Sequence, residues 1–180
     1  MTVESLTRSL AYLTGEMPGI GGRIKTRAED FLVEEIPLYE PCGEGEHLYL
    51  FIEKRGQTTS DVVRRLAKLF KVRPRQIGYA GLKDKRAVTR QVFSIHLPDA
   101  SEQDKALHRF EFLPFTLLWH DRHKNKLRRG HLKGNRFVIF IREVEPASVV
   151  TAKRILDRLA ETGVPNYFGK QRFGYRQSNH

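Results

Sequence analysis

Residues 47–97 constrain the fold more than any other part of the chain. They begin with the run HLYLFIEK (residues 47–54), which is apolar almost throughout and predicts a strand inside a sheet. Residues 60–71 place apolar side chains at helical spacing, so we expect an amphipathic helix that ends before Pro74, with candidate N-cap residues in the run 58–61. Two strands are predicted next, at residues 77–80 and 92–97. This order of elements predicts a fold in which helices cover a sheet.

The remaining elements fit the same fold class. We expect short helices at residues 4–13 and 101–108, strands at residues 22–27, 29–36, 114–119 and 135–144, and a longer helix at residues 148–162. The predicted architecture is α/β (α+β), with a mixed, mainly antiparallel sheet backed by the helices at residues 60–71 and 148–162. A length of 180 residues suits one domain better than two.

One carboxylate stands out in the turn between the last two strands of this segment. Asp84 lies beside Lys83, Lys85 and Arg86, just after Gly81. Nearby cations favour the ionised carboxylate, which is the nucleophilic form, and loops on a rigid scaffold often carry function. Asp and Gly also suit a solvated turn for backbone reasons alone. The local pattern therefore leaves a chemical and a structural interpretation open.

The charge balance indicates a polyanionic partner. The net charge is +11 and the pI is about 10.0, which favours nucleic acid first and an anionic membrane surface second. We expect no membrane association, because the sequence has no long apolar run. Cys42 is the only cysteine, which excludes an internal disulfide and a cysteine zinc site. The polar N-terminus does not resemble a signal peptide, so we expect a reducing, cytoplasmic location.

Two stretches have the composition expected of an RNA-binding surface. Residues 120–136 hold most of the excess charge and interleave cations with two glycines, which suits phosphate contacts, although a solvated loop would look similar. Residues 165–176 alternate aromatic rings with cations, a pattern that can stack bases or simply pack a glycine-rich turn. His120 and His123 lack a third ligand, so we expect no metal site.

Four stretches, taken together, resemble one known family in its own motif order. Residues 81–91 (GLKDKRAVTRQ) are similar to the catalytic signature of TruD-type tRNA pseudouridine synthases. Lys25 with residues 29–35 (EDFLVEE) resembles the family's N-terminal motif. Residues 126–137 (KLRRGHLKGNRF) and 166–174 (NYFGKQRFG) resemble its middle and last motifs. The resemblance extends from about Lys25 to the C-terminus.

The resemblance implies isomerisation of a uridine to pseudouridine in tRNA, at position 13 of the D arm, without a cofactor or metal. It implies that Asp84 is the nucleophile, attacking the sugar C1′ or the base C6 of a flipped-out nucleotide. Phe137 would stack on the base, Asn135 would position Asp84 or the base, and Lys25 and Phe31 would line the pocket. The RNA-binding residues that we assign in addition are Lys83, Lys85, Arg86, Lys126, Arg128, Arg129, Lys133, Asn166, Phe168, Gln171 and Arg172.

The resemblance also sets the expected extent of the domain. Residues 1–180 correspond to the N-terminal part of such a catalytic domain, and the family's inserted domain and C-terminal part would lie beyond His180. We expect a monomer with weak or absent activity for this chain alone. One alternative is a non-catalytic RNA-binding module. A second alternative, a nuclease, has less support, because no cluster of carboxylates that could bind Mg²⁺ accompanies Asp84.

Overall fold

A computed structural model describes residues 12–99 and 101–165 of the chain. They divide into two compact units, one of residues 23–142 and one that pairs the stretch before residue 23 with the stretch after residue 142. The first unit holds the sheet, with strands β1 Phe31–Pro37, β2 His47–Arg55, β3 Ile77–Tyr79, β4 Val88–His96, β5 Phe115–His123 and β6 Leu132–Ile139. Its helices are α1 Thr59–Leu69 and α2 Ser101–Leu107, and the second unit contains α3 Ser148–Thr162.

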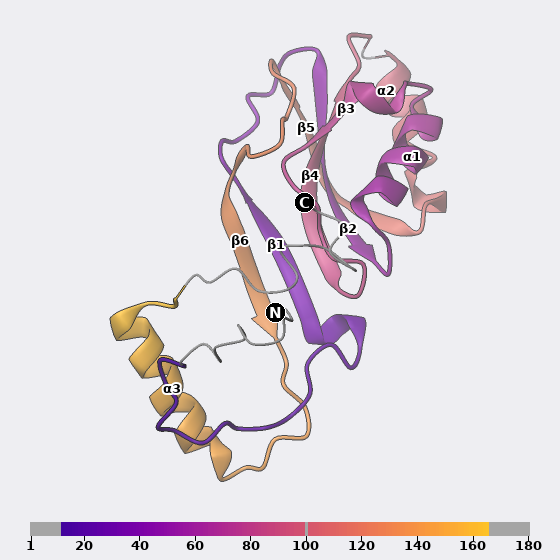
Figure 1. Ribbon diagram of the computed structural model, residues 1–180. Coiled ribbons are helices and arrows are strands. Elements are labelled where there is room, and N and C mark those ends of the chain that lie inside the picture. The colour runs from indigo at the N-terminus through magenta and orange to yellow at the C-terminus, as the bar shows by residue number, and fades with distance from the viewer. Residues whose placement is uncertain (1–11, 100, 166–180) are drawn as a thin grey trace, which may run out of the picture. The chain divides into compact units, whose positions relative to one another are not determined.

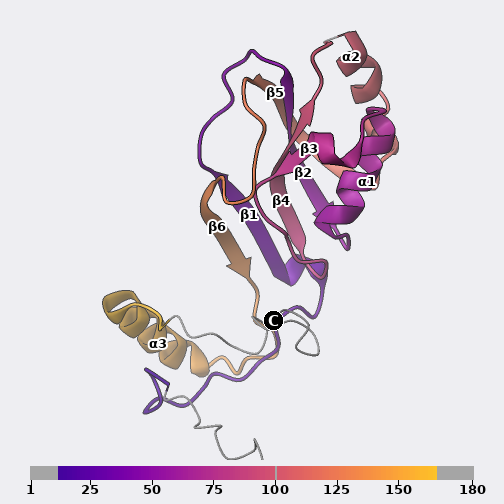
Figure 2. The same cartoon turned by 45° about the horizontal axis from the view of Figure 1, so that its top comes forward.

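The sheet is mixed and mainly antiparallel, which confirms the predicted fold class. Its strand order is β5-β2-β4-β1-β6, and β3 pairs with the second half of β4. Only β1 and β4 run parallel among the paired strands that the structure describes. Figure 1 shows α1 and α2 together on one side of this sheet, and Figure 2 shows the same arrangement from a second direction.

The main core forms between the sheet and these two helices. Apolar side chains at alternate positions of β2 and β4 point to the same face, and they pack against the apolar side of α1. The buried residues of this core include Leu48, Leu50, Ile52, Val62, Leu66, Phe70, Phe93 and Ile95. Of the four candidate N-cap residues, Thr58 caps α1: its hydroxyl accepts a hydrogen bond from the Asp61 N–H, and the Asp61 carboxylate accepts one from the Thr58 N–H.

Several predicted boundaries are wrong. The strand expected at residues 22–27 is absent, because Arg23 forms only an isolated bridge to Arg142 and Lys25 has a positive φ of 56°. The strand at residues 114–119 continues to His123, and the one expected at residues 135–144 lies at Leu132–Ile139. The basic stretch 120–136 is therefore divided between the end of β5, a loop and the start of β6.

The helix at residues 148–162 lies where the sequence predicts it. It belongs to the second unit, so its packing on the sheet stays a prediction. The helix expected at residues 4–13 lies almost wholly outside the described residues. No helix within residues 12–99 and 101–165 has the length and hydropathy needed to cross a bilayer.

Candidate active site

Strand register places the predicted site residues on one face of the sheet. Residues 31, 33 and 35 of β1 point to the same side, and they pair with residues 139, 137 and 135 of β6. The same register continues through Thr89 of β4 to Lys54 of β2, so this is also the face that α1 covers. Phe31 and Asn135 therefore share a face with Phe137, as the predicted roles require.

Asp84 lies on the loop between β3 and β4, at the open part of this face. Its side chain is 45% exposed, and its Oδ2 accepts a hydrogen bond of 2.8 Å from Lys25 Nζ. The same Nζ lies 3.9 Å from the centre of the Phe31 ring, a cation–π contact. Phe31 in turn meets Phe137 edge to face, with ring centres 6.0 Å apart, and Phe137 is 54% exposed. Carboxylate, ammonium and aromatic surface are thus presented together to solvent.

Lys83 is directed away from solvent, unlike its neighbours on the loop. Its Nζ lies 2.8 Å from Glu35 Oε2 and donates a hydrogen bond of 2.7 Å to Asn135 Oδ1. The Lys83 and Glu35 side chains are almost completely buried. This placement favours a role in holding the loop against β1 and β6, and an RNA contact by Lys83 stays a prediction. Lys85 and Arg86 are exposed on the same loop.

Two buried polar side chains fix the loop backbone just before Asp84. Thr59, the first residue of α1, accepts a hydrogen bond from the Lys83 N–H (3.0 Å) and donates one to Gln91 Oε1 (2.9 Å). Gln91 Nε2 donates to the Gly81 carbonyl at 3.1 Å. The loop is therefore tied at two points to α1 and β4, so the carboxylate is held on a rigid support.

Lys54 binds the main chain of the Asp84 loop from the buried side of the sheet. It is 1% exposed, and its Nζ donates to the main-chain carbonyls of Asp84 (3.1 Å) and Gln57 (2.7 Å). No carboxylate among the described residues forms an ion pair with it. Burial lowers the pKa of Lys54 to about 8, and the charge of Asp84 acts in the opposite direction.

Sequence reasoning missed the supporting roles of Glu35, Lys54, Thr59 and Gln91. Lys54 carried a signal that could have been used. Leu48, Leu50 and Ile52 alternate along the core face of β2, and the next position on that face is this lysine. A lysine at an inward position is rare unless it has a specific partner.

The middle basic motif packs directly beside the Asp84 loop. The Gly130 N–H donates to the Ala80 carbonyl (2.8 Å), and the Leu127 N–H donates to Ser94 Oγ (2.9 Å). Gly78 allows this close approach, because a Cβ at that position would lie 2.1 Å from the Leu127 carbonyl oxygen. The main chain of this motif is therefore fixed against the start of the Asp84 loop and against β3 and β4.

The predicted RNA-binding cations of this motif have different surroundings. Lys126 donates to the Arg75 carbonyl, and Arg129 donates to the Tyr79 hydroxyl at 3.2 Å while lying over its ring. Arg128 and Lys133 are exposed. The last group of predicted site residues, Asn166, Phe168, Gln171 and Arg172, lies outside the described residues.

A buried ion pair anchors the segment that carries Lys25. Asp30 is fully buried, and it accepts two hydrogen bonds from the Arg142 guanidinium, at 2.7 and 2.6 Å. The Arg27 N–H donates to the same carboxylate. These bonds, chiefly those from Arg142, hold the pKa of the Asp30 carboxyl below its usual value. Because Arg23 also pairs with Arg142 through the main chain, this clamp fixes both ends of the segment before β1.

The Asp30 clamp predicts a specific dependence of stability on pH. A lowered pKa means that the carboxylate contributes stability above the ordinary value of 3.8 and loses it as the pH falls through the folded value. We expect Asp30→Asn to lower the melting temperature by several degrees at pH 7, and the difference from the parent to shrink towards pH 3. Melting curves at both pH values measure this, with the exposed neighbour Glu29→Gln as control. A deficit of equal size at pH 3 would contradict it.

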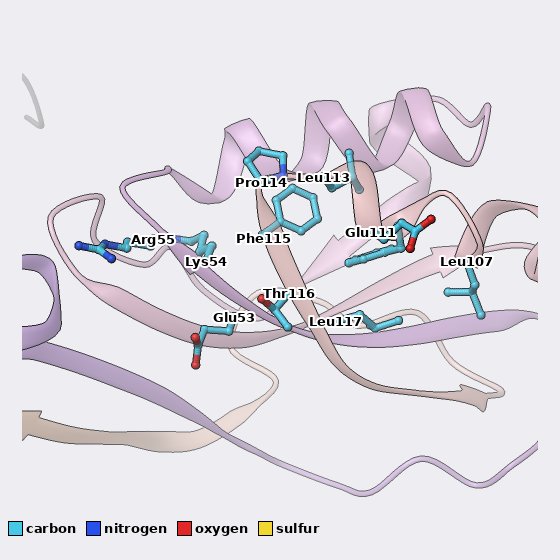
Figure 3. A pocket seen from close by; sticks show the side chains of 11 residues that line it. Glu53, Lys54, Arg55, Leu107, Glu111, Leu113, Pro114, Phe115, Thr116 and Leu117 are labelled. Atoms are coloured by element: carbon cyan, nitrogen blue, oxygen red, sulfur yellow. The ribbon is translucent and has the colours of Figure 1, made fainter.

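A hollow of about 640 Å³ lies beside the candidate site, between β2, β5 and the segment before β5 (Figure 3). Its lining residues include Glu53, Lys54, Arg55, Glu111 and Thr116, together with apolar side chains such as Phe115 and Leu117. None of Lys25, Phe31, Asp84 and Phe137 lines it. The two acids offset the two cations, so this hollow does not offer the positive surface that a phosphate backbone needs.

The described residues also lack a cluster of three or more His, Cys, Asp or Glu side chains that could hold a metal ion. His120 and His123 both lie on β5. His123 stacks on Tyr39, with ring centres 5.0 Å apart.

The fold is that of an α/β domain, and one face of its mixed sheet carries the candidate site around Asp84. The family model described as TruD, tRNA pseudouridine synthase D, matches residues 8–180. The chain therefore belongs to the TruD family.

Curated relatives and a solved structure agree with this family. The chain is 52% identical over 169 residues to the tRNA pseudouridine synthase D of Syntrophotalea carbinolica, covering 94% of this chain and 42% of the relative. It is 54% identical over 164 residues to a tRNA pseudouridine synthase D of Thermus thermophilus, covering 91% and 45%. A crystal structure of a putative TruD from Methanosarcina mazei matches with a TM-score of 0.77 and 35% identity, covering 88% of this chain and 36% of that one. The chain thus spans less than half the length of these relatives.

Proposed function

We propose that this chain supplies the catalytic face of an enzyme that isomerises a uridine in tRNA to pseudouridine. One observation carries the proposal. The exposed Asp84 carboxylate is held by Lys25 beside the Phe31 and Phe137 rings, on a rigid loop flanked by the basic motif. Family membership supports the reaction class. Position 13 of the D arm, the tRNA partner and the monomeric state belong to the proposal, and the cytoplasmic location stays a prediction.

The proposed reaction is balanced without a cofactor. The bond between the uracil N1 and the ribose C1′ breaks, the base rotates, and a C5–C1′ bond forms while C5 loses its proton and N1 gains one. Asp84 acts as the nucleophile in its ionised form and leaves unchanged at the end of the cycle. Attack at C1′ and attack at C6 are both compatible with a carboxylate in this position.

Access to the uridine requires that the nucleotide leave its stack. Flipping a nucleotide out of folded RNA costs a few kcal/mol, and stacking of the base on an aromatic side chain returns about 1–3 kcal/mol. Phe137 is suited to this contact, because it is half exposed and Phe31 supports its edge. Asn135 accepts from Lys83 and so has a fixed orientation on the same face.

In a chimera that carries the 169 aligned residues of this chain in place of those of the Syntrophotalea carbinolica relative, we expect Phe137→Ala to lower activity through loss of this stacking. The catalytic efficiency should fall by the equivalent of about 1–3 kcal/mol, with folding unaffected because the ring is half exposed. The adjacent Val138→Ala is the matched control, since that side chain points to the opposite face of β6. Steady-state kinetics on both variants measure the difference, and equal effects would argue against a stacking role.

The reaction class is tested by release of tritium from tRNA labelled at uracil C5. Both this chain and a chimera should be assayed, the chimera carrying the 169 aligned residues of this chain in place of those of the Syntrophotalea carbinolica relative. We expect release by the chimera, little or none by the chain alone, and no effect of a metal chelator. A chimera that binds tRNA but releases no tritium would favour the non-catalytic RNA-binding module. Cleavage of the tRNA strand that a chelator inhibits, without tritium release, would favour a metal-dependent nuclease.

A further inference from the structure

A second positive surface lies at the far end of α1 from the Asp84 loop. It surrounds a hollow of about 530 Å³ between the end of α1 and the segment after α2. We call it the Phe112 hollow, and its lining residues are Arg65, Lys68, Leu69, Lys71, Arg109, Phe112 and Leu113. Figures 1 and 2 both show α2 next to α1 here, and a smaller hollow between Phe70 and Ala106 marks the same junction.

The apolar part of this hollow is open to solvent. Phe112 is 79% exposed, although it lies in a turn whose neighbour Phe110 is buried in the core. Leu69 and Leu113 are partly buried beside it. The Phe112 ring and the two leucines therefore form a small apolar surface that a ligand can reach from solvent.

The charges around Phe112 are of one sign. The four cations of the hollow are Arg65, Lys68, Lys71 and Arg109, and no carboxylate lines it. The structure records no ion pair between any of the four and a carboxylate of the described chain. Arg64, by contrast, is paired with Asp61 one turn earlier on the same helix. Unneutralised cations gathered at one place favour the binding of a polyanion.

The position of the hollow relates it to the candidate site. α1 begins at Thr59, which is bonded to the loop of Asp84, and ends at Leu69 in the wall of the hollow. Ten helical steps separate these two ends by about 15 Å. An RNA that places one nucleotide at Asp84 is large enough to reach this surface as well.

We infer that the Phe112 hollow binds an unpaired segment of the substrate RNA outside the reacting nucleotide. A base stacks on Phe112 and the flanking phosphates contact the four cations, which is the combination that single-stranded RNA sites use. The inference rests on the proposed function for the identity of its ligand. It adds a contact region that none of the four sequence motifs includes.

Binding of an unmodified tRNA transcript, measured by fluorescence anisotropy from 50 to 200 mM salt, tests the inference. Reversal of charge in Arg65→Glu with Lys68→Glu should weaken binding by the chain and the chimera about tenfold or more and reduce the slope of log K against log salt by about two. Phe112→Ala should weaken binding about tenfold at every salt concentration. Arg154→Glu with Arg158→Glu on α3 is the control for net charge, with a smaller effect expected. Equal effects of the two charge reversals, or none from Phe112→Ala, would overturn the inference.

A labelling experiment decides what covers Phe112. In a Cys42→Ser background, Phe112→Cys should react rapidly with a maleimide in the chimera, and tRNA should slow the reaction at least fivefold. Slow labelling without RNA would mean that the rest of the polypeptide covers the hollow. Labelling at the same rate with and without RNA would mean that RNA does not bind there, and the hollow would then be a candidate site for a protein partner. Both results contradict the inference. Binding and labelling need no turnover, so they test the RNA contact independently of the reaction. If the chimera releases no tritium but the Arg65, Lys68 and Phe112 variants still bind RNA less tightly, the proposed isomerase activity is refuted and the proposed RNA contact is not.

Discussion

Asp84→Asn should abolish pseudouridine formation by the chimera, with a fall in turnover of at least about a thousandfold. The amide has nearly the shape of the carboxylate but lacks the charge and nucleophilicity needed for a covalent bond. The loop should keep its position, because Thr59, Gln91 and Lys54 hold its main chain rather than the Asp84 side chain. The defect should therefore lie in the chemical step.

Binding separates this result from loss of the fold. The affinity of Asp84→Asn for a tRNA transcript should remain within about threefold of the parent, since removal of one negative charge does not weaken a phosphate contact. Asp157→Asn on α3 is the matched control, because Asp157 is an exposed aspartate paired with a lysine at 2.6 Å, as Asp84 is at 2.8 Å. It should leave turnover unchanged. Formation of product at the normal rate by Asp84→Asn would refute the assignment of Asp84 as the nucleophile.

Lys54→Met should reduce turnover in the chimera about a hundredfold, although Lys54 is too deeply buried to contact substrate. Methionine fills a similar volume but leaves the Asp84 and Gln57 carbonyls without their donor, and a buried unpaired acceptor costs about 1–3 kcal/mol. The loop can recover this by moving towards water, which displaces the carboxylate. A shift of about 1 Å is enough to cost two orders of magnitude in rate.

The pH dependence distinguishes the charge of Lys54 from its hydrogen bonds. The pKa of this side chain is about 8 in the folded chain, against 10.5 for an ordinary lysine. The unfolded chain therefore binds more protons between these values, and this group makes stability rise with pH across that window. Urea unfolding of the chain at pH 7.5 and 10 should show this rise in the parent and not in Lys54→Met. A neutral amine can still donate to both carbonyls.

The pH profile of turnover by the chimera separates the two contributions of Lys54. If catalysis needs its positive charge, turnover should fall above pH 8; if catalysis needs only its hydrogen bonds, turnover should stay level. Lys54→Arg keeps the charge at high pH and should move this decline upwards, even if its larger side chain lowers the maximum rate. A parent whose unfolding free energy shows no rise between pH 8 and 10.5 relative to Lys54→Met would contradict the assignment.

The spacing of apolar residues was sufficient to predict the elements whose own sequence carries a clear pattern. The helix from Thr59 to Leu69 and the strand that starts at His47 were predicted almost to the residue, because their apolar spacing and capping residues are local signals. The end of β6 was not, because the apolar run continues past Ile139 after pairing with β1 has ended. Lys25 was predicted in a strand, whereas its positive φ and the Asp30 clamp direct its side chain to Asp84.

Lys25, Phe31, Asp84 and Phe137 were singled out from the sequence and lie together in the structure, while their roles in the reaction stay predictions. The side chains that support them were missed. Asp84 stood out through the cations around it, but the pairing of Lys83 with Glu35 depends on contacts between residues 48 positions apart. Such partners follow from strand register, which sequence spacing alone does not give. The same holds for Lys54 and the Asp84 carbonyl.

Site-resolved mapping of pseudouridine tests the central claim most directly. An unmodified tRNA transcript is treated in parallel with the chimera and with its Asp84→Asn variant, and every uridine is then read for conversion. We expect conversion at a single uridine of the D arm, position 13, by the chimera and none by the variant. Conversion by both proteins, or by neither while the Syntrophotalea carbinolica relative itself converts the same tRNA, would contradict the assignment of Asp84 and of this face of the sheet as the active site.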